Sequence, residues 1–355
     1  MGNPIKKLVK SIPQIKKVVE ARDFYMAQSA QLRQENERLA AESERFMMDA
    51  RNGRNLIATL YGKEEYYSDI VVGGSYRHVA TFTTAIGCPV KCRYCPQSVF
   101  VRAYGERRNP VKKLTLDIFK TMLAKIPKDV IISFTGFVDD FANPECLDMI
   151  IYTLNQGYKT RVFSTMYNAS IETYQAFADH ENLTTFDLHL PDCQGNTVFP
   201  ITDSYKSLLR YIVAHKPKHG TFWTSCLGID GGVHPEISDI IQVNPNPVNS
   251  VHGLVYPNYL DHGTVDLSCK RDCSRLDFPK AGVGAILPNG DVIGCTQDWE
   301  LKHVIGNLLD AGSWDEIING PERARFKAAL TDPSIPSICR HCELAVRINA
   351  GTKIE

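Results

Sequence analysis

The sequence lacks an excess of charge of either sign. Lysine and arginine together number 40, aspartate and glutamate also number 40, and the formal net charge is therefore 0. Proteins that bind nucleic acids usually carry a strongly basic surface, so this balance argues against a nucleic-acid partner. The sequence also has no apolar run of about 18 residues, the length that a membrane-spanning helix requires. These absences favour a soluble, or at most membrane-associated, protein.

The sequence shows no secretory signal peptide, which predicts a cytoplasmic protein. Cysteine, in contrast, is abundant, with 11 residues in a chain of 355. In a reducing compartment, cysteines rarely form disulfides and are expected to serve as metal ligands. A chain of this length can form a large core and more than one domain.

Residues 1–60 differ in pattern from the rest of the chain and predict an N-terminal helical extension. Apolar residues alternate with lysines at helical spacing over residues 5–19, as in a basic amphipathic helix on an anionic membrane surface. Further along, one apolar residue recurs every seven positions: Tyr25, Leu32, Leu39 and Phe46. The second apolar position of a heptad is mostly polar here. The extension therefore either docks on a membrane or partner, or packs one edge on the rest of the chain.

From about Tyr76 the pattern alternates between strands and helices. Runs rich in β-branched and apolar residues predict six strands, over 79–84, 130–135, 160–165, 185–190, 221–227 and 251–256. Helical spacing predicts helices between them, over 117–126, 145–155, 171–179 and 205–215. This alternation indicates βαβ units and a parallel sheet over residues 76–260. In such folds the chemistry lies at the carboxyl ends of the strands.

Three cysteines follow the first predicted strand with the spacing Cys-x3-Cys-x2-Cys: Cys88, Cys92 and Cys95. Thiolates suit iron–sulfur clusters, and four of them normally saturate a four-iron cluster. A loop that supplies three leaves one iron open to a substrate or cofactor. The alternative is a zinc site, which usually uses Cys-x2-Cys pairs with a fourth ligand nearby.

The spacing of this loop, with the aromatic Tyr94 directly before the third cysteine, resembles the radical S-adenosylmethionine (SAM) superfamily. The resemblance implies an α/β fold, a partial (β/α)6 barrel similar to a TIM barrel, with SAM bound to the open iron of a [4Fe–4S] cluster. It also implies a 5′-deoxyadenosyl radical that abstracts hydrogen from a substrate carbon. The electron for that reaction would come from a reductant such as flavodoxin or ferredoxin.

The same resemblance suggests which residues contact SAM. Tyr94 would lie against the adenine. Gly136 and Asp139 follow the second predicted strand. Relatives have a glycine-rich turn there that ends in Glu-Pro and binds the SAM amino group, whereas this chain has Val-Asp-Asp in place of that ending. Ser164 and Thr165 occupy the position of hydroxyls that contact the methionine carboxylate or the ribose. The alternative for the Asp139 segment is an acidic turn that caps the next helix, and the alternative for Ser164 and Thr165 is ordinary turn chemistry at the end of a strand.

The C-terminal region, residues 261–355, resembles the shortened auxiliary-cluster domain called twitch or partial SPASM. The resemblance implies one auxiliary [4Fe–4S] cluster, with four cysteines as its ligands: Cys273, Cys295, Cys339 and Cys342. Cys269 could replace Cys273 or stay free. The Asn289-Gly290 pair predicts a two-residue hairpin that places Cys295 on its second strand. A structural zinc site is the alternative.

Two further cysteines stand near the ends of predicted strands, outside both clusters. Cys193 and Cys226 are candidates to return a hydrogen atom to a substrate radical, with inert packing as the alternative for each. Cys146 is expected to be a small buried residue on a helix. Several polar residues could bind hydroxyls or accept an alcohol proton, or be ordinary loop residues: His189, Asp192, Asp230, His234 and His252.

These features favour a radical SAM dehydrogenase or epimerase that acts on a carbohydrate or aminocyclitol-type substrate. An auxiliary cluster that accepts an electron would lead to a carbonyl product, and a thiol hydrogen donor would lead to epimerisation. The balanced charge and the lack of an evident leader-peptide-binding domain favour a small-molecule or glycan substrate. The alternatives are a peptide- or protein-modifying maturase and a non-enzymatic metal-binding protein.

Overall fold

The fold is seen in a computed structural model of the chain. The chain divides into two compact units, residues 1–73 and 74–355. The structure describes residues 17, 20–28, 31, 78–92, 95–226, 232–242, 267–269, 284–296, 298–329, 332, 334–338 and 345–347.

The N-terminal unit is helical over residues 20–28, in agreement with the predicted helical extension. The side chains of this segment are exposed, including Phe24, Tyr25 and Met26. The basic stretch over 5–19 lies outside the described residues except for Lys17, and membrane contact through it stays a prediction. The rest of the seven-residue repeat also lies outside them: Leu32, Leu39 and Phe46. Within the part of the chain that the structure describes, no helix is long and apolar enough to cross a membrane.

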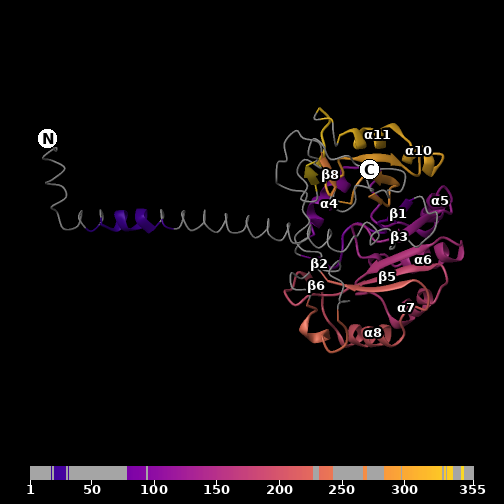
Figure 1. Ribbon diagram of the computed structural model, residues 1–355, viewed down its shortest axis with the longest axis horizontal. Helices are drawn as coiled ribbons and strands as arrows, with labels where there is room; N and C mark the ends of the chain where they lie inside the picture. Colours follow the sequence, from indigo (N-terminus) through magenta and orange to yellow (C-terminus); the bar gives the residue numbers. More distant parts are fainter. Residues whose placement is uncertain are drawn as a thin grey trace. The chain divides into compact units, whose positions relative to one another are not determined.

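A parallel sheet forms the centre of the second unit (Figure 1). Its strands lie side by side in the order β1 (His78–Phe82), β3 (Val130–Phe134), β4 (Thr160–Ser164), β5 (Leu183–His189) and β7 (Thr221–Ser225). These correspond to five of the six predicted strands, with ends that differ by at most two residues. The sixth predicted strand, 251–256, lies outside the described residues. The alternating strands and helices confirm the predicted α/β barrel-like fold.

The predicted helices are also present, as α5 (Leu116–Leu123), α6 (Cys146–Asn155), α7 (Ile171–Ala178) and α8 (Asp203–Ala214). Hydroxyl side chains accept hydrogen bonds from backbone N–H groups in the first turns of three of them: Thr115, Ser170 and Thr202. Helix α5 ends three residues earlier than predicted, because Pro127 disfavours helical backbone in the residue before it. Helix α4 (Gln97–Gly105) was not predicted. It starts directly after the third cysteine of the loop and buries Phe100 and Tyr104.

The two faces of the parallel sheet differ in chemistry. Side chains alternate between the faces along each strand. The helix face consists of residues that pack with α5, α6, α7 and α8 in one apolar core: Phe82, Phe134, Val162, Phe186 and Leu188. The opposite face, here called the inner face, is largely polar: Thr81, Ser133, Arg161, Phe163, Asp187, His189, Trp223 and Ser225. The strand register brings these inner-face residues next to one another.

The C-terminal region extends the same sheet. Strand β9 (Ala285–Ile286) pairs in parallel with β1 through Phe82 and Ile286, and β10 (Asp291–Ile293) and β11 (Val304–Asn307) follow antiparallel. Helices α10 (Trp314–Ile318) and α11 (Pro321–Ala328) pack beside β11. Two short strand pairs complete the description: β2 (Lys91–Cys92) with β6 (Thr197–Val198), and β8 (Leu267–Cys269) with β12 (Ala345–Arg347). Two single turns of 3-10 helix are η1 (Asp140–Ala142) and η2 (Pro235–Ile237).

The hairpin between β9 and β10 differs from the predicted two-residue Asn-Gly turn. The Gly290 N–H donates to the Leu287 carbonyl at 2.9 Å, so Pro288 and Asn289 are the central residues of the turn. Gly290 follows with φ +86°, whereas Asn289 does not have a positive φ. The loop is therefore one residue longer, because Pro288 favours the first central position of a turn with negative φ angles. Cys295 lies two residues beyond the end of β10 instead of on it, after a register shift in the pairing of β10 with β11 between Val292 and Ile293.

Candidate active site

The three-cysteine loop leaves the carboxyl end of β1 and returns beside the loop that follows β5. Cys92 is the last residue of β2, and it pairs with Thr197 of β6. Cys88, Cys92 and Cys95 are all half-buried. Tyr94 lies outside the described residues. The strand pair thus holds the loop against the carboxyl edge of the sheet, where barrel folds place their chemistry.

Two hydrogen-bond donors point at sulfur atoms of this loop. The backbone N–H of Asp139 donates to Cys88 Sγ at 3.4 Å, and Gln97 Nε2 donates to Cys95 Sγ at 3.3 Å. Burial raises the pKa of the Cys88 thiol to about 12 and that of Cys95 to about 11, although the two hydrogen bonds act to lower these pKa values. Donors aimed at sulfur suit thiolates, and bound iron supplies the positive charge that offsets the cost of burial. The loop therefore fits an iron–sulfur cluster.

Within the described residues, no three His, Cys, Asp or Glu side chains gather closely enough to hold a single metal ion. An iron–sulfur cubane makes a different demand, because each thiolate binds a separate iron at a separate corner. The thiol of Cys92 interacts electrostatically with those of both Cys88 and Cys95, so the three lie near one another.

The turn after β3 joins the cluster loop to the end of β4. Gly136 has φ +124°, and a Cβ there would lie 2.4 Å from Thr83 Oγ1, so this position requires glycine. The carboxylate of Asp139 accepts hydrogen bonds from Ser164 Oγ at 3.1 Å, Thr165 Oγ1 at 2.7 Å and the Thr165 N–H at 2.7 Å. The structure thus brings together three of the residues that the resemblance suggested for SAM. We propose that they bind SAM there.

Asp139 and Asp140 have different surroundings. Burial raises the pKa of Asp139, and the hydrogen bonds from Thr165 and Ser164 lower it. The Phe141 N–H is a further donor, so the carboxylate already accepts about the four hydrogen bonds that such a group can take, and an ammonium group would have to replace one of these donors. Asp140 is fully buried and accepts no side-chain hydrogen bond from the residues described. Burial, followed by the charge of Asp139, raises the pKa of Asp140 well above the usual range.

Both candidate hydrogen donors contact Gly232. Cys193 is exposed, and its N–H donates to the Gly232 carbonyl at 2.9 Å. A Cβ at Gly232 would lie 3.0 Å from Cys193 Sγ, so the missing side chain leaves space for this thiol. Cys226 is fully buried, with Sγ 3.8 Å from the Gly232 oxygen. Accessibility therefore distinguishes the two thiols. Cys146 is fully buried on α6, as a packing residue would be.

Other polar candidates have structural partners. Asp192 is buried and accepts hydrogen bonds from the N–H groups of Gln194, Asn196 and Thr197, which shapes the loop around Cys193. His234 precedes η2, and its Nδ1 accepts a hydrogen bond from the Glu236 N–H at 3.3 Å. Two candidates lie outside the described residues: Asp230 and His252.

A chain of polar side chains crosses the inner face towards the cluster loop. Ser225 Oγ donates to Asp187 Oδ1 at 2.7 Å, and His189 Nδ1 lies 3.4 Å from the same hydroxyl. His189 Nε2 lies 3.5 Å from Thr197 Oγ1. Because Thr197 pairs with Cys92, this chain connects Asp187 to the cluster loop. Phe163, which is 37% exposed, stacks on the His189 ring with centroids 5.7 Å apart.

The environment of this polar chain shifts two pKa values in opposite senses. Burial raises the pKa of Asp187 to about 6, although the hydrogen bond from Ser225 and the positive charge of Arg161 both act to lower it. Burial lowers the pKa of His189 to about 4, against the charge of Asp192. At neutral pH His189 is therefore uncharged, and Asp187 titrates near the working range. Sequence reasoning missed Asp187, although a lone carboxylate inside a buried strand is itself a signal of function.

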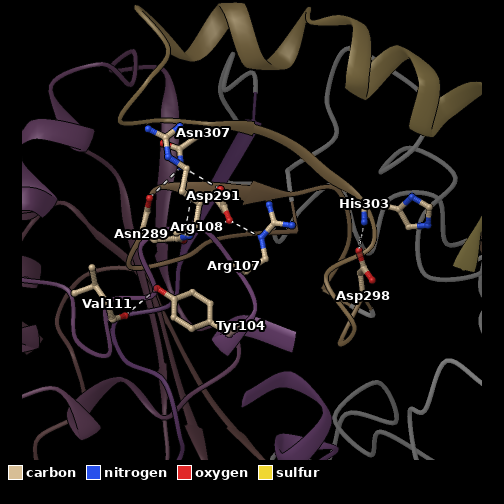
Figure 2. A network of polar contacts seen from close by, with 9 residues as sticks. All are labelled: Tyr104, Arg107, Arg108, Val111, Asn289, Asp291, Asp298, His303 and Asn307. Carbon is tan, nitrogen blue, oxygen red and sulfur yellow. Dashed lines mark hydrogen bonds and ion pairs between the residues drawn. The ribbon is translucent and has the colours of Figure 1, made fainter. Parts of the chain in front are cut away.

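A second network anchors the hairpin that precedes Cys295 (Figure 2). Asp291 Oδ2 accepts from Arg107 Nε at 2.9 Å and from Asn289 Nδ2 at 2.9 Å, while Oδ1 accepts from Asn307 Nδ2 at 3.0 Å. Asn289 Nδ2 also donates to the Arg108 carbonyl at 3.0 Å. The segment after α4 is thus attached to the hairpin of the auxiliary region.

Beyond the hairpin, His303 connects two cysteine-bearing segments. Asp298, three residues after Cys295, accepts from the N–H of His303 at 2.5 Å. Nε2 of His303 accepts in turn from the Ile338 N–H at 3.1 Å, one residue before Cys339. The side chains of the other proposed auxiliary ligands lie outside the description: Cys269, Cys273, Cys339 and Cys342. Cys295 itself is half-buried. The geometry brings the neighbourhoods of Cys295 and Cys339 together, as ligands of one cluster require.

Comparison with known proteins supports an iron–sulfur assignment. The SPASM family, an iron–sulfur cluster-binding domain, matches residues 281–343, a span that contains Cys295, Cys339 and Cys342. The match shows a SPASM-type iron–sulfur domain over these residues, and the three-cysteine loop resembles that of radical SAM enzymes. The matched domain indicates an auxiliary iron–sulfur cluster in the C-terminal region.

No curated protein matches the sequence. Among solved structures, BtrN in complex with AdoMet and 2-DOIA is 12% identical, with a TM-score of 0.47 over 76% of this chain and 94% of that chain. Streptococcus suis SuiB is 13% identical, with a TM-score of 0.45 over 76% of this chain and 71% of that chain. SuiB bound to precursor peptide SuiA is 14% identical, with a TM-score of 0.44 over 76% of this chain and 70% of that chain. The similar structures thus include one with a small molecule and one with a peptide.

Proposed function

We propose that the protein is a radical SAM enzyme whose cofactors are SAM, a SAM-binding [4Fe–4S] cluster and an auxiliary [4Fe–4S] cluster. Its substrate would be a carbohydrate or aminocyclitol-type small molecule, dehydrogenated or epimerised on the inner face of the sheet. The observation that carries the proposal is the polar chain from Asp187 to Thr197. Parallel sheets are usually apolar on both faces. A row of hydrogen-bonding groups on one face, beside the cluster loop, suits a substrate rich in hydroxyl or amino groups.

Asp187 is the residue that we expect to bind a substrate hydroxyl. Its carboxylate already accepts from Ser225, and His189 holds that serine from the other side. A pKa of about 6 suits a general base that accepts the proton of an alcohol near neutral pH. The exposed ring of Phe163 offers an apolar surface to the C–H face of a sugar or cyclitol ring.

When bound, SAM and its cluster supply a 5′-deoxyadenosyl radical that abstracts hydrogen from a substrate carbon, and the auxiliary cluster supplies an electron acceptor. In dehydrogenation, Asp187 takes the hydroxyl proton of the substrate. In epimerisation, the exposed Cys193 thiol would return a hydrogen atom to the carbon and become a thiyl radical, which one electron from the reductant and one proton would restore to the thiol. We further propose that Cys226 is a packing residue, because it is fully buried. The electron donor is proposed to be a reductant such as flavodoxin or ferredoxin.

The proposal is tested with the anaerobically reconstituted, reduced enzyme in D2O. Aminocyclitols, sugars and unrelated peptides are offered separately, and 5′-deoxyadenosine and the mass of each candidate substrate are measured. A polyol or aminocyclitol is expected to stimulate SAM cleavage. Dehydrogenation would remove two hydrogen atoms from it, whereas epimerisation would introduce one solvent deuterium. If peptides alone stimulate cleavage, the enzyme is a maturase and the proposal is wrong.

Matched cysteine variants separate the two outcomes. If the enzyme is an epimerase, Cys193→Ser should abolish deuterium incorporation while 5′-deoxyadenosine is still formed, because only the hydrogen return is lost. Cys226→Ser is the control and should retain incorporation. The opposite pattern would assign hydrogen return to Cys226 and contradict the role of Cys193.

A further inference from the structure

Gln97 is the first residue of α4, directly after Cys95-Pro96, and its side chain turns back to the cluster loop. Its amide group is oriented by the Phe137 carbonyl, an acceptor, which lies 2.5 Å from Nε2. The same nitrogen donates to Cys95 Sγ at 3.3 Å. The amide oxygen Oε1 is buried and accepts no hydrogen bond from the described residues. One side chain thus connects a cluster sulfur to the turn after β3.

We propose that Gln97 is a positioning residue that hydrogen-bonds the Cys95 thiolate and raises the reduction potential of the SAM-binding cluster. Reduction adds negative charge to the cluster, and a donor aimed at a ligand sulfur stabilises that charge. The potential of an iron–sulfur cluster depends on such hydrogen bonds. Without the donor, the cluster is therefore harder to reduce.

The donors to the two sulfurs differ in kind. Cys88 Sγ receives its hydrogen bond from a backbone N–H, that of Asp139, which no substitution at that position removes except proline. Cys95 Sγ receives its hydrogen bond from a side chain. Both donors belong to one connected group, because Gln97 Nε2 also holds Phe137, two residues before Asp139. Gln97 therefore adjusts the cluster and aligns the turn that carries Asp139.

The test is an anaerobic redox titration of the reconstituted Gln97→Met enzyme, followed by the electron paramagnetic resonance signal of the SAM-binding cluster. Methionine retains the length of the side chain and lacks the N–H donor. At a fixed potential, the ratio of reduced to oxidised cluster is expected to fall about tenfold, equivalent to about 59 mV for one electron. No substrate is needed, so the result is independent of the proposed reaction.

Two variants complete the test. Ser98→Ala, at the exposed neighbouring position of α4, is the control and should titrate like the wild type. Gln97→Glu retains the shape of the side chain and replaces the donor by an acceptor, so it should lower the potential further. Iron and sulfide content are measured for each protein. If the Gln97→Met enzyme assembles less cluster than the wild type, the potential of the Gln97→Glu enzyme, measured by the same titration, tests the proposal instead. An unchanged potential in the variant that assembles the full cluster would overturn the proposal.

Discussion

On the helix face of the parallel sheet, Phe82, Phe134 and Phe186 are fully buried in one apolar core with the surrounding helices. On the inner face, the same sheet presents Ser133, Asp187 and Ser225. Burying polar groups costs free energy unless they are hydrogen-bonded, so an inner face of this kind does not arise from the demands of stability. The helix face holds the sheet together, and the inner face and its carboxyl edge are where we propose that the chemistry takes place.

The largest effect is expected where the carboxyl edge supplies ligands. Changing Cys88, Cys92 and Cys95 together to Ala should remove about four irons per chain and all SAM cleavage, because no thiolate then holds the cluster. Iron analysis and anaerobic 5′-deoxyadenosine measurement check this. Cys193→Ala is the control and should retain the full iron content. SAM cleavage that survives the triple change would show that the loop has been misinterpreted.

A matched pair of phenylalanines tests the division between the faces. Phe186→Ala, on the helix face, should lower the free energy of unfolding by about 3 to 5 kcal/mol, because it leaves a cavity among Tyr174, Phe177 and Phe222. Phe163→Ala, on the inner face of the adjacent strand, should cost about 1 kcal/mol or less, because this side chain is partly exposed. Denaturant unfolding of both variants provides the measurement. Equal losses would contradict the division.

A smaller effect is expected from the titration of Asp187. Its pKa in the folded protein is raised to about 6, so folding favours the protonated form. The contribution of Asp187 to the free energy of unfolding is therefore greatest below about pH 4, and about 3 kcal/mol of it is lost as the pH rises to about 6. His189 acts in the opposite sense, because its pKa is lowered to about 4 and its neutral form favours folding as the pH rises.

The contribution of Asp187 is isolated by comparing Asp187→Asn with the wild type. Between pH 4 and pH 6 the wild type should lose stability relative to the variant, because Asp187 loses its proton over this range and Asn does not titrate. Wild-type activity should rise with pH over the same range, because the general base must be deprotonated. A difference curve that is flat would contradict the raised pKa.

Much of the fold could be predicted from local patterns. The β-branched runs of β1, β3 and β4 and the apolar spacing of α6 and α7 reflect which face each side chain occupies, and that information is local. The turn before β10 was predicted less well, because Pro288 and Gly290 together favour a longer loop than the Asn-Gly pair alone. Helix α4 was missed because its sequence follows the cysteine loop without a conventional capping residue.

The candidate site was predictable only in part. The spacing of Cys88, Cys92 and Cys95 is a local feature of the sequence, and it indicated the chemistry directly. The contact of Asp139 with Ser164 and Thr165 joins residues about 25 positions apart. Family resemblance suggested these residues one by one, but their meeting depends on parallel pairing of neighbouring strands. Asp187 carried no motif, so only its burial and its neighbours distinguish it.

By itself, the sequence determined the ligand loop, the alternation of strands and helices and the auxiliary cysteines, because each depends on the types and spacing of residues close in the chain. The tertiary structure decided which polar residues meet. In the fold, Asp192 accepts hydrogen bonds that shape a loop, Asp187 lies beside Ser225, and the amide of Gln97 donates to Cys95. Burial and electrostatic environment depend on segments distant in the chain, and they decide whether a carboxyl, imidazole or amide group supports the fold or the chemistry.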